Sequence, residues 1–295
     1  MSHCFGLTLR NGPRNSAQRA VVKGPNAGSR TAQPRRRRVN GLKQRARILR
    51  DGIKFSLFKL QTFRSSREKF ECPVCRYIGP LMDVCPPTGL RKHAKCPYCG
   101  AFERHRLQYL AISDVLRNRD TSRMRMLHFA PEPCFRAIFR RQFGQYETVD
   151  LSMEDVDCNL DIRNLPFRDA SYDFILASIV LDYIADDSVA MREIRRVLKV
   201  NGVAILPVSL AGATTIEYSE PNPFEAGHVR SCGLDYFERY ERYFREVQTL
   251  SSDSFPGKYQ LFIYEDRTVW PNKACPMRRS MPGEKHIDVV PVCHA

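Results

Sequence analysis

Short apolar runs alternate with amphipathic segments through the middle of the chain. Four runs have the length and composition of buried strands: residues 126–129, 147–151, 172–180 and 202–208. Residues 132–143 and 188–200, which lie between these runs, carry apolar positions at helical spacing, with Asp187 as the expected N-cap of the second segment. Because strands that alternate with helices form parallel sheets covered on both faces, the pattern predicts a doubly wound α/β fold.

The segments that flank this alternation are predicted from the same patterns. Residues 101–118 form a helix with apolar positions on one face, and residues 245–270 form a last antiparallel hairpin with 260–264 as one strand. Residues 271–295 are predicted to be a C-terminal tail. Residues 42–68 mix apolar with basic side chains and predict a basic amphipathic helix. That helix could lie on an anionic membrane surface, but packing on its own domain is the favoured interpretation.

The net charge of +15 is concentrated at the N-terminal end of the chain. Residues 1–50 hold 13 Lys and Arg and no Asp or Glu, which leaves 34 basic and 32 acidic residues for the remainder. The folded part is therefore nearly neutral, and residues 1–41, which lack apolar periodicity, are predicted to be a disordered basic tail. The tail could be a solvated leader without function, an organellar targeting leader or a nucleic-acid-binding arm.

The sequence contains no apolar stretch of the length of a membrane span and no secretory signal pattern. A cytoplasmic location is the default expectation, and an organelle is the alternative if the basic N-terminus is a transit peptide. In a reducing compartment the eleven cysteines indicate a metal site instead of a disulfide framework.

Four of the cysteines stand in two tight pairs. The pairs are Cys72-Pro-Val-Cys75 and Cys96-Pro-Tyr-Cys99, separated by 20 residues. Two such turns can bring four thiolates around one zinc ion, so residues 69–118 are predicted to be a zinc ribbon with a linking helix. Cys85 and His93 lie between the pairs and could replace a ligand, although neither stands in a paired turn. A closed four-thiolate site leaves no position for water, so the zinc is expected to be structural.

Residues 124 to about 210 carry four motifs in the order and spacing of one known family. The motifs are YETVDLS (146–152), DIRNLPF (161–167), SYDFILASIVLDY (171–183) and RVLKVNGVAIL (196–206). In these motifs the chain resembles the class I, Rossmann-like methyltransferases that use S-adenosylmethionine (SAM), and among them the type 11 group. The resemblance implies a mostly parallel seven-stranded sheet over residues 119–270 and SAM as the cofactor.

The resemblance also implies a set of cofactor-binding residues at the carboxyl ends of the strands, where open α/β sheets bind their ligands. Asp150 is expected to accept the ribose hydroxyls, Asp161 to accept the adenine amino group, and Ile162 to flank the adenine ring. The full expected set is Ala130, Glu132, Asp150, Leu151, Asp161, Ile162 and Ser178.

The first motif departs from the family pattern because residues 127–134 contain no glycine. Glycine normally lets the backbone approach the cofactor closely, and here Ala130 is the small residue of the turn. Glu132 opens the next helix and could face the ammonium group of SAM, while His128 replaces the usual acid and lines the turn. The chain is similar to a smaller bacterial-type subgroup that combines a zinc ribbon with a His-Phe-Ala-Pro-Glu-like turn.

Candidate residues for the acceptor side follow the predicted fourth strand and a later loop. Asp182 and Tyr183 stand where relatives carry a polar or acidic residue near the methyl donor. His228 could act as a base and Arg230 could hold an anionic group, but both could equally belong to a capping and salt-bridge network. Residues 104–106, with the sequence Arg-His-Arg, could contact phosphate or an acidic substrate, or could equally cap the zinc knuckle.

Three functions follow from these features. The favoured one is methyl transfer to a small molecule or metabolite, since the body of the chain is nearly neutral. An RNA or ribosome methyltransferase that uses the ribbon and the basic tail is the second. A non-catalytic binding module on a methyltransferase fold is the third. The sequence leaves the acceptor and the oligomeric state open.

Overall fold

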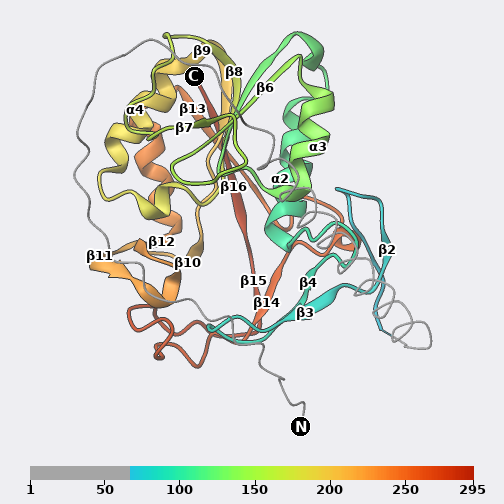
Figure 1. Ribbon diagram of the computed structural model, residues 1–295. Helices are drawn as coiled ribbons and strands as arrows, with labels where there is room; N and C mark the ends of the chain where they lie inside the picture. The colour runs from blue at the N-terminus through green and yellow to red at the C-terminus, as the bar shows by residue number, and fades with distance from the viewer. Residues whose placement is uncertain (1–66) are drawn as a thin grey trace, which may run out of the picture. The chain divides into compact units, whose positions relative to one another are not determined.

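A seven-stranded sheet forms the centre of residues 67–295, the part of the chain that the computed structural model describes (Figure 1). The predicted basic tail over 1–41 lies outside the described residues, as does the predicted amphipathic helix over 42–68 apart from its last two positions.

The strands of this sheet follow the order β13-β16-β9-β8-β5-β6-β7. Their bounds are β5 (Arg125–Phe129), β6 (Gln145–Asp150), β7 (Cys158–Asn159), β8 (Tyr172–Ala177), β9 (Leu198–Ile205), β13 (Glu246–Ser251) and β16 (Val289–His294). Strands β5 to β9 pair in parallel, and β16 runs antiparallel to both of its neighbours. The predicted mostly parallel seven-stranded sheet is therefore confirmed.

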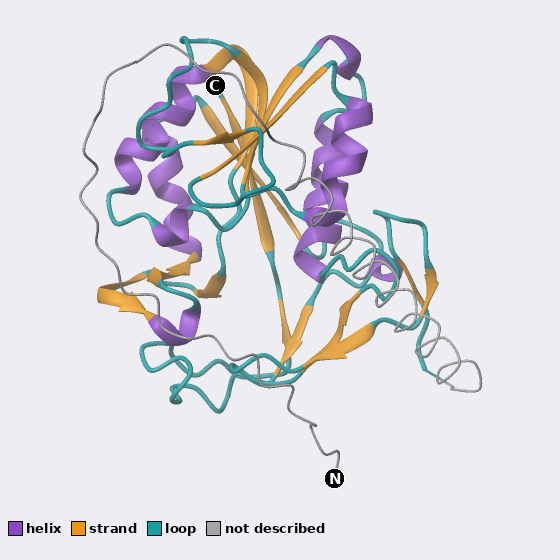
Figure 2. Ribbon diagram, in the orientation of Figure 1, coloured by secondary structure: helices purple, strands orange, loops and turns teal. Residues whose placement is uncertain are grey.

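Both faces of the sheet are covered by helices, as Figure 2 shows. The helices and 3-10 helices are α2 (Glu103–Val115), α3 (Pro133–Gln142), α4 (Asp187–Val197), η1 (Thr121–Arg123), η2 (Leu181–Tyr183), η3 (Pro223–Glu225), η4 (Leu234–Arg242) and η5 (Gly257–Tyr259). In β8, Phe174 and Leu176 pack in the core that includes side chains of α2 and α3, whereas Ile175 and Ala177 pack in the core that includes α4 and η4. Strands buried on both faces explain why the sequence shows continuous apolar runs there.

The N-cap of helix α4 lies one residue before the predicted position. The N-cap position is Asp186, and the predicted cap Asp187 is already helical. The carboxylate of Asp187 instead accepts hydrogen bonds from the Tyr236 hydroxyl at 2.7 Å and from Arg239 at 2.8 Å. Asp187 therefore ties α4 to η4 across one layer of the fold.

The C-terminal residues were predicted to be a tail, and the structure corrects this. Strand β16 inserts between β9 and β13 and is buried along Val289–Cys293. Pro291 argues against a central strand because it cannot donate to the ladder, yet its carbonyl still accepts from the Leu206 amide at 3.4 Å. The predicted strand over 260–264 also differs, because β14 (Ile263–Glu265) belongs to another sheet.

That other sheet joins the cysteine ribbon to residues 252–288, which connect β13 to β16. Its order is β15-β14-β4-β3, with bounds β3 (Met82–Val84), β4 (Arg91–Lys95) and β15 (Lys285–His286), and the ribbon also contains the hairpin of β1 (Phe70–Glu71) and β2 (Ile78–Gly79). Arg106 of α2 holds the join, since its buried guanidinium donates to the carbonyls of Ala94 and Ala101 in the ribbon and to that of Tyr259. Arg106 therefore has the structural role that the sequence left open.

A third sheet follows β9 and carries part of the site. Its order is β10-β12-β11, with bounds β10 (Leu210–Gly212), β11 (Ile216–Asn222) and β12 (His228–Gly233). Strand β12 contacts η2, the short helix that follows β8. Two segments about 45 residues apart in the sequence thus meet at the carboxyl edge of the main sheet.

Candidate functional site

The carboxyl ends of the parallel strands carry two residues with left-handed backbone conformations. Ala130 follows β5 with φ of 45°, and Ile179 lies two residues beyond β8 with φ of 52°. Residues other than glycine rarely adopt this conformation, and a β-branched residue does so at a higher cost. Such strained positions occur mainly at functional sites, and here β5 and β8 are neighbours in the sheet.

Ala130 takes the conformation that a glycine would take in the turn after β5. Its amide donates to the Val149 carbonyl of β6 at 2.9 Å, which fixes the turn against the next strand. The missing glycine therefore costs backbone strain, but the turn still forms with the smallest residue that has a Cβ atom.

We expect Ala130→Gly to raise the free energy of unfolding by about 1 kcal/mol, because glycine removes the left-handed strain. Ala137→Gly is the matched control, since Ala137 is exposed in the middle of α3, where glycine lowers stability by about 1 kcal/mol. Chemical denaturation of both variants measures the difference. A loss of stability in Ala130→Gly would contradict a strained turn.

A chain of hydrogen bonds runs behind this turn. The buried His128 ring bonds the Glu132 carboxylate through Nε2 at 2.7 Å and the Tyr146 hydroxyl through Nδ1 at 2.8 Å. Burial raises the pKa of Glu132, but the hydrogen bond and charge of His128 outweigh it, so the pKa is lowered overall. Glu132 is thus held as a carboxylate, which suits a cationic ligand group. The sequence suggested only that His128 lines the turn and did not show that it positions Glu132.

Asp150 ends β6 with one oxygen occupied and the other available. Its Oδ1 accepts from the amides of Ser152 at 2.7 Å and Met153 at 2.8 Å, which fixes the carboxylate. Within residues 67–295, no donor bonds its Oδ2. Leu151 beside it is 70% exposed. A free carboxylate oxygen can accept hydrogen bonds from the hydroxyls of a ribose, and the exposed apolar side chain beside it can pack on a ring that the ribose carries.

The next acidic candidate has a protein partner. Asp161 pairs with Arg163, whose Nη2 lies 2.6 Å from Oδ2, and this hydrogen bond lowers the pKa of Asp161. Ile162 is buried in the core, so its side chain does not offer an open face to a ring as Leu151 does. Of the two apolar candidates, Leu151 is the one whose side chain is open to a ligand.

The four paired cysteines converge in the ribbon. Their Sγ atoms all lie within 4.8 Å of one another, and the Cys72–Cys99 and Cys75–Cys96 separations are 3.6 Å. Four thiolates at about 2.3 Å from one ion would lie about 3.8 Å apart, so the cluster has the size of a tetrahedral metal site. Among the described residues, no other group of His, Cys, Asp or Glu side chains has such a geometry.

The two cysteine turns are built alike. The amide of Arg76 donates to the Cys72 carbonyl at 2.7 Å, and the amide of Gly100 donates to the Cys96 carbonyl at 3.0 Å. Both donors have positive φ, 61° and 77°. Each turn therefore presents its two thiolates to the same point, and Cys85 and His93 are not members of the cluster.

Three of the acceptor-side candidates come together beyond β8. Asp182 is fully buried, and its Oδ1 accepts from the Ser209 amide at 2.8 Å. Burial raises the pKa of Asp182 to about 6. His228 Nδ1 lies 4.0 Å from Asp182 Oδ1, and the Tyr183 ring meets the His228 ring edge to face at 4.6 Å. Burial lowers the pKa of His228 to about 4. The imidazole is therefore neutral near pH 7.

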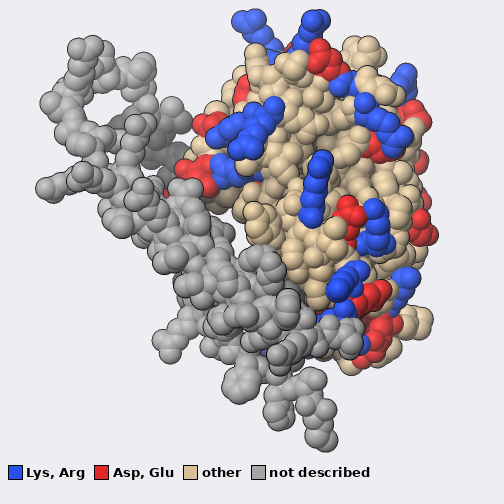
Figure 3. Space-filling model, turned by 90° about the vertical axis from the view of Figure 1, so that its right-hand side faces the viewer, with Lys and Arg blue, Asp and Glu red and all other residues tan. Residues whose placement is uncertain are grey.

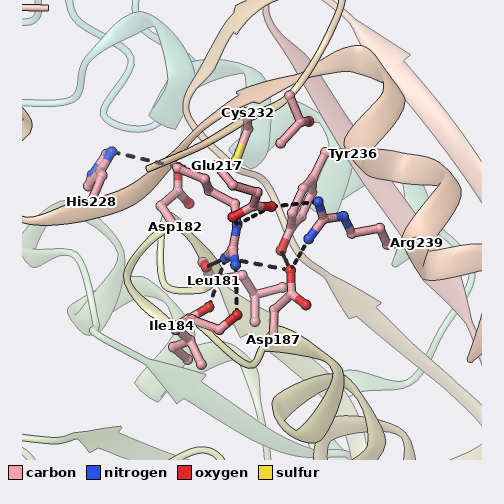
Figure 4. Close-up of polar contacts among 12 residues, drawn as sticks. Leu181, Asp182, Ile184, Asp187, Glu217, His228, Cys232, Tyr236 and Arg239 are labelled. Atoms are coloured by element: carbon pink, nitrogen blue, oxygen red, sulfur yellow. Dashed lines mark hydrogen bonds and ion pairs between the residues drawn. The ribbon is translucent and has the colours of Figure 1, made fainter. Parts of the chain in front are cut away.

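Arg230, the fourth candidate, is occupied by the protein itself. Figure 4 shows Leu181, Ile184, Glu217 and Asp187 gathered around the polar contacts that it makes. Its Nη1 donates to the carbonyls of Leu181 at 2.6 Å and Ile184 at 2.8 Å, and Nη2 donates to that of Ala185 at 2.9 Å. Nε bonds both oxygens of Glu217 at 3.0 and 3.1 Å. These contacts do not fit the expectation that Arg230 holds a substrate anion. They make it the residue that fixes the turn carrying Asp182.

A cavity lies beyond the ends of β8 and β9, next to these candidates. Ile179 and residues 207–210 form one wall, Arg104 and Gln108 of α2 form a second, and side chains from the ribbon and from residues 263–288 form the remainder. Gln108 Nε2 donates to Ser178 Oγ at 3.0 Å, which connects the cavity to the cofactor set. Sequence patterns did not point to Gln108 or to residues 263–288, because these positions follow no motif.

The family comparison covers the part of the chain that contains these strand ends. Residues 127–206 match the family described as a methyltransferase domain. Together with the strand order, this match identifies a class I, Rossmann-like methyltransferase fold and confirms the predicted fold class. No curated protein matches the chain.

Two solved structures illustrate the likeness. The YcgJ protein from Bacillus subtilis is 16% identical, with a TM-score of 0.38, over 63% of this chain and 96% of that one. An S-adenosylmethionine-dependent methyltransferase from Mesorhizobium loti is 15% identical, with a TM-score of 0.40, over 64% of this chain and all of that one. Likenesses of this degree say nothing of the acceptor.

Proposed function

We propose that this protein, whose residues 127–206 carry a methyltransferase domain, transfers a methyl group from SAM to a small-molecule acceptor. The observation that carries the proposal is the position of Asp150 at the end of β6, inside the matched domain, with one carboxylate oxygen fixed by amides and the other open. The cofactor would lie across the ends of β5 to β8, and the acceptor would lie in the adjoining cavity.

The residues around the cofactor can be given roles. Asp150 would accept the ribose hydroxyls, Asp161 the adenine amino group, and Glu132 the ammonium group. Leu151 would pack on the adenine, while Ala130 and Ser178 would line the path to the sulfur. These roles are supported by the open Oδ2 of Asp150 and by the ionised, histidine-held carboxylate of Glu132.

When bound, SAM supplies a methyl group that is activated by its positively charged sulfur. The protein's main task is then to hold the acceptor atom in line with the carbon–sulfur bond. The acceptor atom bonds the methyl carbon as that bond breaks, and the electron pair stays on sulfur. Asp182, with a pKa raised to about 6, or the neutral His228 would take the proton that the acceptor loses. Tyr183 packs on His228 and would limit its movement.

The four-cysteine cluster is proposed to hold a structural zinc ion. Four thiolates complete a tetrahedron and leave no position for a reacting water. The buried apolar side chains of the ribbon, Phe70, Val74 and Leu81, pack in the core that includes α2 and α3, so the metal would add to the stability that this packing gives.

We expect Asp150→Ala to weaken SAM binding about tenfold to a hundredfold, since a hydrogen bond to a charged group contributes about 1.5–3 kcal/mol. Isothermal titration of SAM and then S-adenosylhomocysteine into the full chain measures this. Asp253→Ala is the control because Asp253 is exposed in the loop after β13. Failure of the folded wild-type protein to bind either compound would overturn the proposal and favour a non-catalytic module.

The face drawn in Figure 3 supports a small acceptor over RNA. On this face Lys and Arg are interspersed with Asp and Glu and form no basic stripe of the kind that a nucleic-acid site requires. Within this part of the chain, no helix has the length and apolar character needed to cross a bilayer.

A further inference from the structure

Four arginines line the cavity beyond β8 and β9. They are Arg91 from β4, Arg104 from α2, and Arg267 and Arg278 from the segment between β14 and β15. Arg267 and Arg278 are almost fully buried. Buried arginines from separate segments resemble a built binding site and not a solvated basic surface.

Three of these arginines have a carboxylate partner. Arg91 pairs with Glu103, Arg267 Nε lies 3.1 Å from Glu265, and Arg278 Nη2 lies 2.7 Å from Glu225.

Arg104 differs from the other three. Within residues 67–295, no carboxylate lies at ion-pairing distance from its guanidinium group. The guanidinium instead lies over the Phe102 ring, with Cζ 5.3 Å from the ring centroid. Its Nε is buried and bonds no acceptor in the protein. The residue as a whole is only partly buried, and the unpaired Nε is the part that is withdrawn from water. An unused arginine donor without a counter-ion in the cavity wall suits a negative charge.

Further buried polar atoms around the cavity have no protein partner. Nε of Arg91 and Nε of Arg278 are unused donors, and Oε1 of the fully buried Gln108 is an unused acceptor. Buried donors and acceptors are normally paired, so several orphans around one cavity indicate a ligand with polar groups. The donors belong to arginines, which bind carboxylate and phosphate oxygens well.

Two unused acceptors lie just outside the cavity wall. Asp182, whose Oδ1 accepts from the amide of the lining residue Ser209, and His228 have a buried Oδ2 and a buried Nδ1 without a hydrogen-bond partner. Burial, together with the charges of Arg278 and Arg104, lowers the pKa of His228 to about 4, so these arginines act on the imidazole electrostatically. Arginine donors in the cavity are therefore neighbours of two proton acceptors behind its wall.

We propose that the cavity binds a carboxylate or phosphate group of the methyl acceptor, with Arg104 as its principal ligand and Arg91 and Arg278 as flanking donors. The proposal rests on the proposed function only for the statement that this anion belongs to the acceptor. The same acceptor would present its nucleophilic atom to Asp182 and His228, next to Ser178. A compact anion suits these recessed arginines better than a nucleic-acid backbone, which needs an open basic track.

The test uses the zinc-loaded full chain with inorganic phosphate and, separately, propionate as probes at constant ionic strength. We expect isothermal titration to show binding of one of the two anions, and the better probe identifies the group as phosphate or carboxylate. Arg104→Gln should weaken that binding about tenfold or more, and Arg104→Lys should retain part of it. Arg117→Gln, an exposed position just after α2 that pairs with Asp114, should bind as the wild type does. Thermal unfolding checks that each variant is folded.

Several results would overturn the proposal. Wild-type protein that binds neither anion would do so, and so would equal binding by wild type and both Arg104 variants. If Arg104→Gln loses affinity for SAM but not for phosphate or propionate, Arg104 holds the cofactor's carboxylate instead. Displacement of the bound anion by single-stranded RNA at a much lower concentration would replace the small acceptor with RNA.

The proposal and the proposed function can fail separately. Asp150→Ala should lose SAM binding and keep anion binding. Wild-type protein that binds an anion through Arg104 but does not bind SAM would refute methyl transfer and leave the anion site in place.

Discussion

Cys96→Ala is expected to release the metal and to lower the free energy of unfolding by several kcal/mol. Structural zinc contributes about 10–16 kcal/mol of binding free energy in small zinc-dependent domains, and removing one of four thiolates opens the site. Cys96 is fully buried in the ribbon, so its replacement removes a thiolate from the interior of the cluster. The other three thiolates then repel one another unless they are protonated.

The destabilisation should not stay within the ribbon. Strand β4 begins five residues before Cys96 and pairs with β14 from the far end of the chain. Arg106 binds carbonyls on both sides of that join. Hydrogen exchange should therefore accelerate in β4 and β14 together, while β5 and β8 in the main sheet keep their protection.

Zinc content per chain and hydrogen exchange measure this effect. Cys85→Ala is the control, because Cys85 lies between the pairs but outside the cluster. Full zinc content in Cys96→Ala would mean that Cys85 or His93 replaces the missing ligand, which would contradict the closed four-cysteine site.

The ribbon also contributes to the proposed acceptor site, because its residues Thr88 and Arg91 line the cavity. Loss of the metal should therefore weaken anion binding more than SAM binding, since the proposed SAM site lies at the ends of strands that belong to a different sheet from β3 and β4. In this arrangement a metal that takes no part in the chemistry still shapes the acceptor site.

The parts of this protein that could be predicted from sequence are those determined by local pattern. The buried strands of the parallel sheet show as continuous apolar runs, and the paired cysteines show as short repeats of one spacing. The position of Asp150 at the end of β6 was predictable because the residue ends such a run within a family motif.

The parts that could not be predicted depend on contacts between distant residues. Strand β16 contains a proline and was taken for a tail, although it completes the centre of the sheet. Arg104, Gln108 and Arg278 meet at one cavity only because α2 and the segment after β14 are brought together by the ribbon's sheet. No spacing in the sequence encodes that meeting, and the same is true of the Arg278–Glu225 pair.

Arg230 illustrates the difference between a motif and its role. The sequence suggested an anion ligand, but its guanidinium bonds three carbonyls of the turn after β8 and the Glu217 carboxylate. It is 1% exposed. Its charge is therefore used to hold residues 181–185 on β12, and that turn positions the Asp182 carboxylate.

Arg230→Met is expected to lower the free energy of unfolding by about 2–4 kcal/mol, because a buried carbonyl that loses its hydrogen-bond donor costs about 1–3 kcal/mol. The substitution removes the guanidinium donors from the carbonyls of Leu181, Ile184 and Ala185. The half-exposed Glu217 keeps its ion pair with Arg239 at 2.6 Å and adds little to the loss. Denaturant unfolding measures the loss. Arg242→Met is the control, because Arg242 ends η4 and is exposed.

The role of Arg230 as a positioning residue makes a second, separable prediction. At a temperature where Arg230→Met is still folded, binding of SAM should be unchanged, because Arg230 bonds the turn of residues 181–185 and Glu217 and none of the proposed cofactor residues. Methyl transfer should fall, since Asp182 is no longer fixed against the Ser209 amide. A variant as stable as the wild type that has lost anion binding would instead return Arg230 to the acceptor site, and Arg104 would then not be its principal ligand.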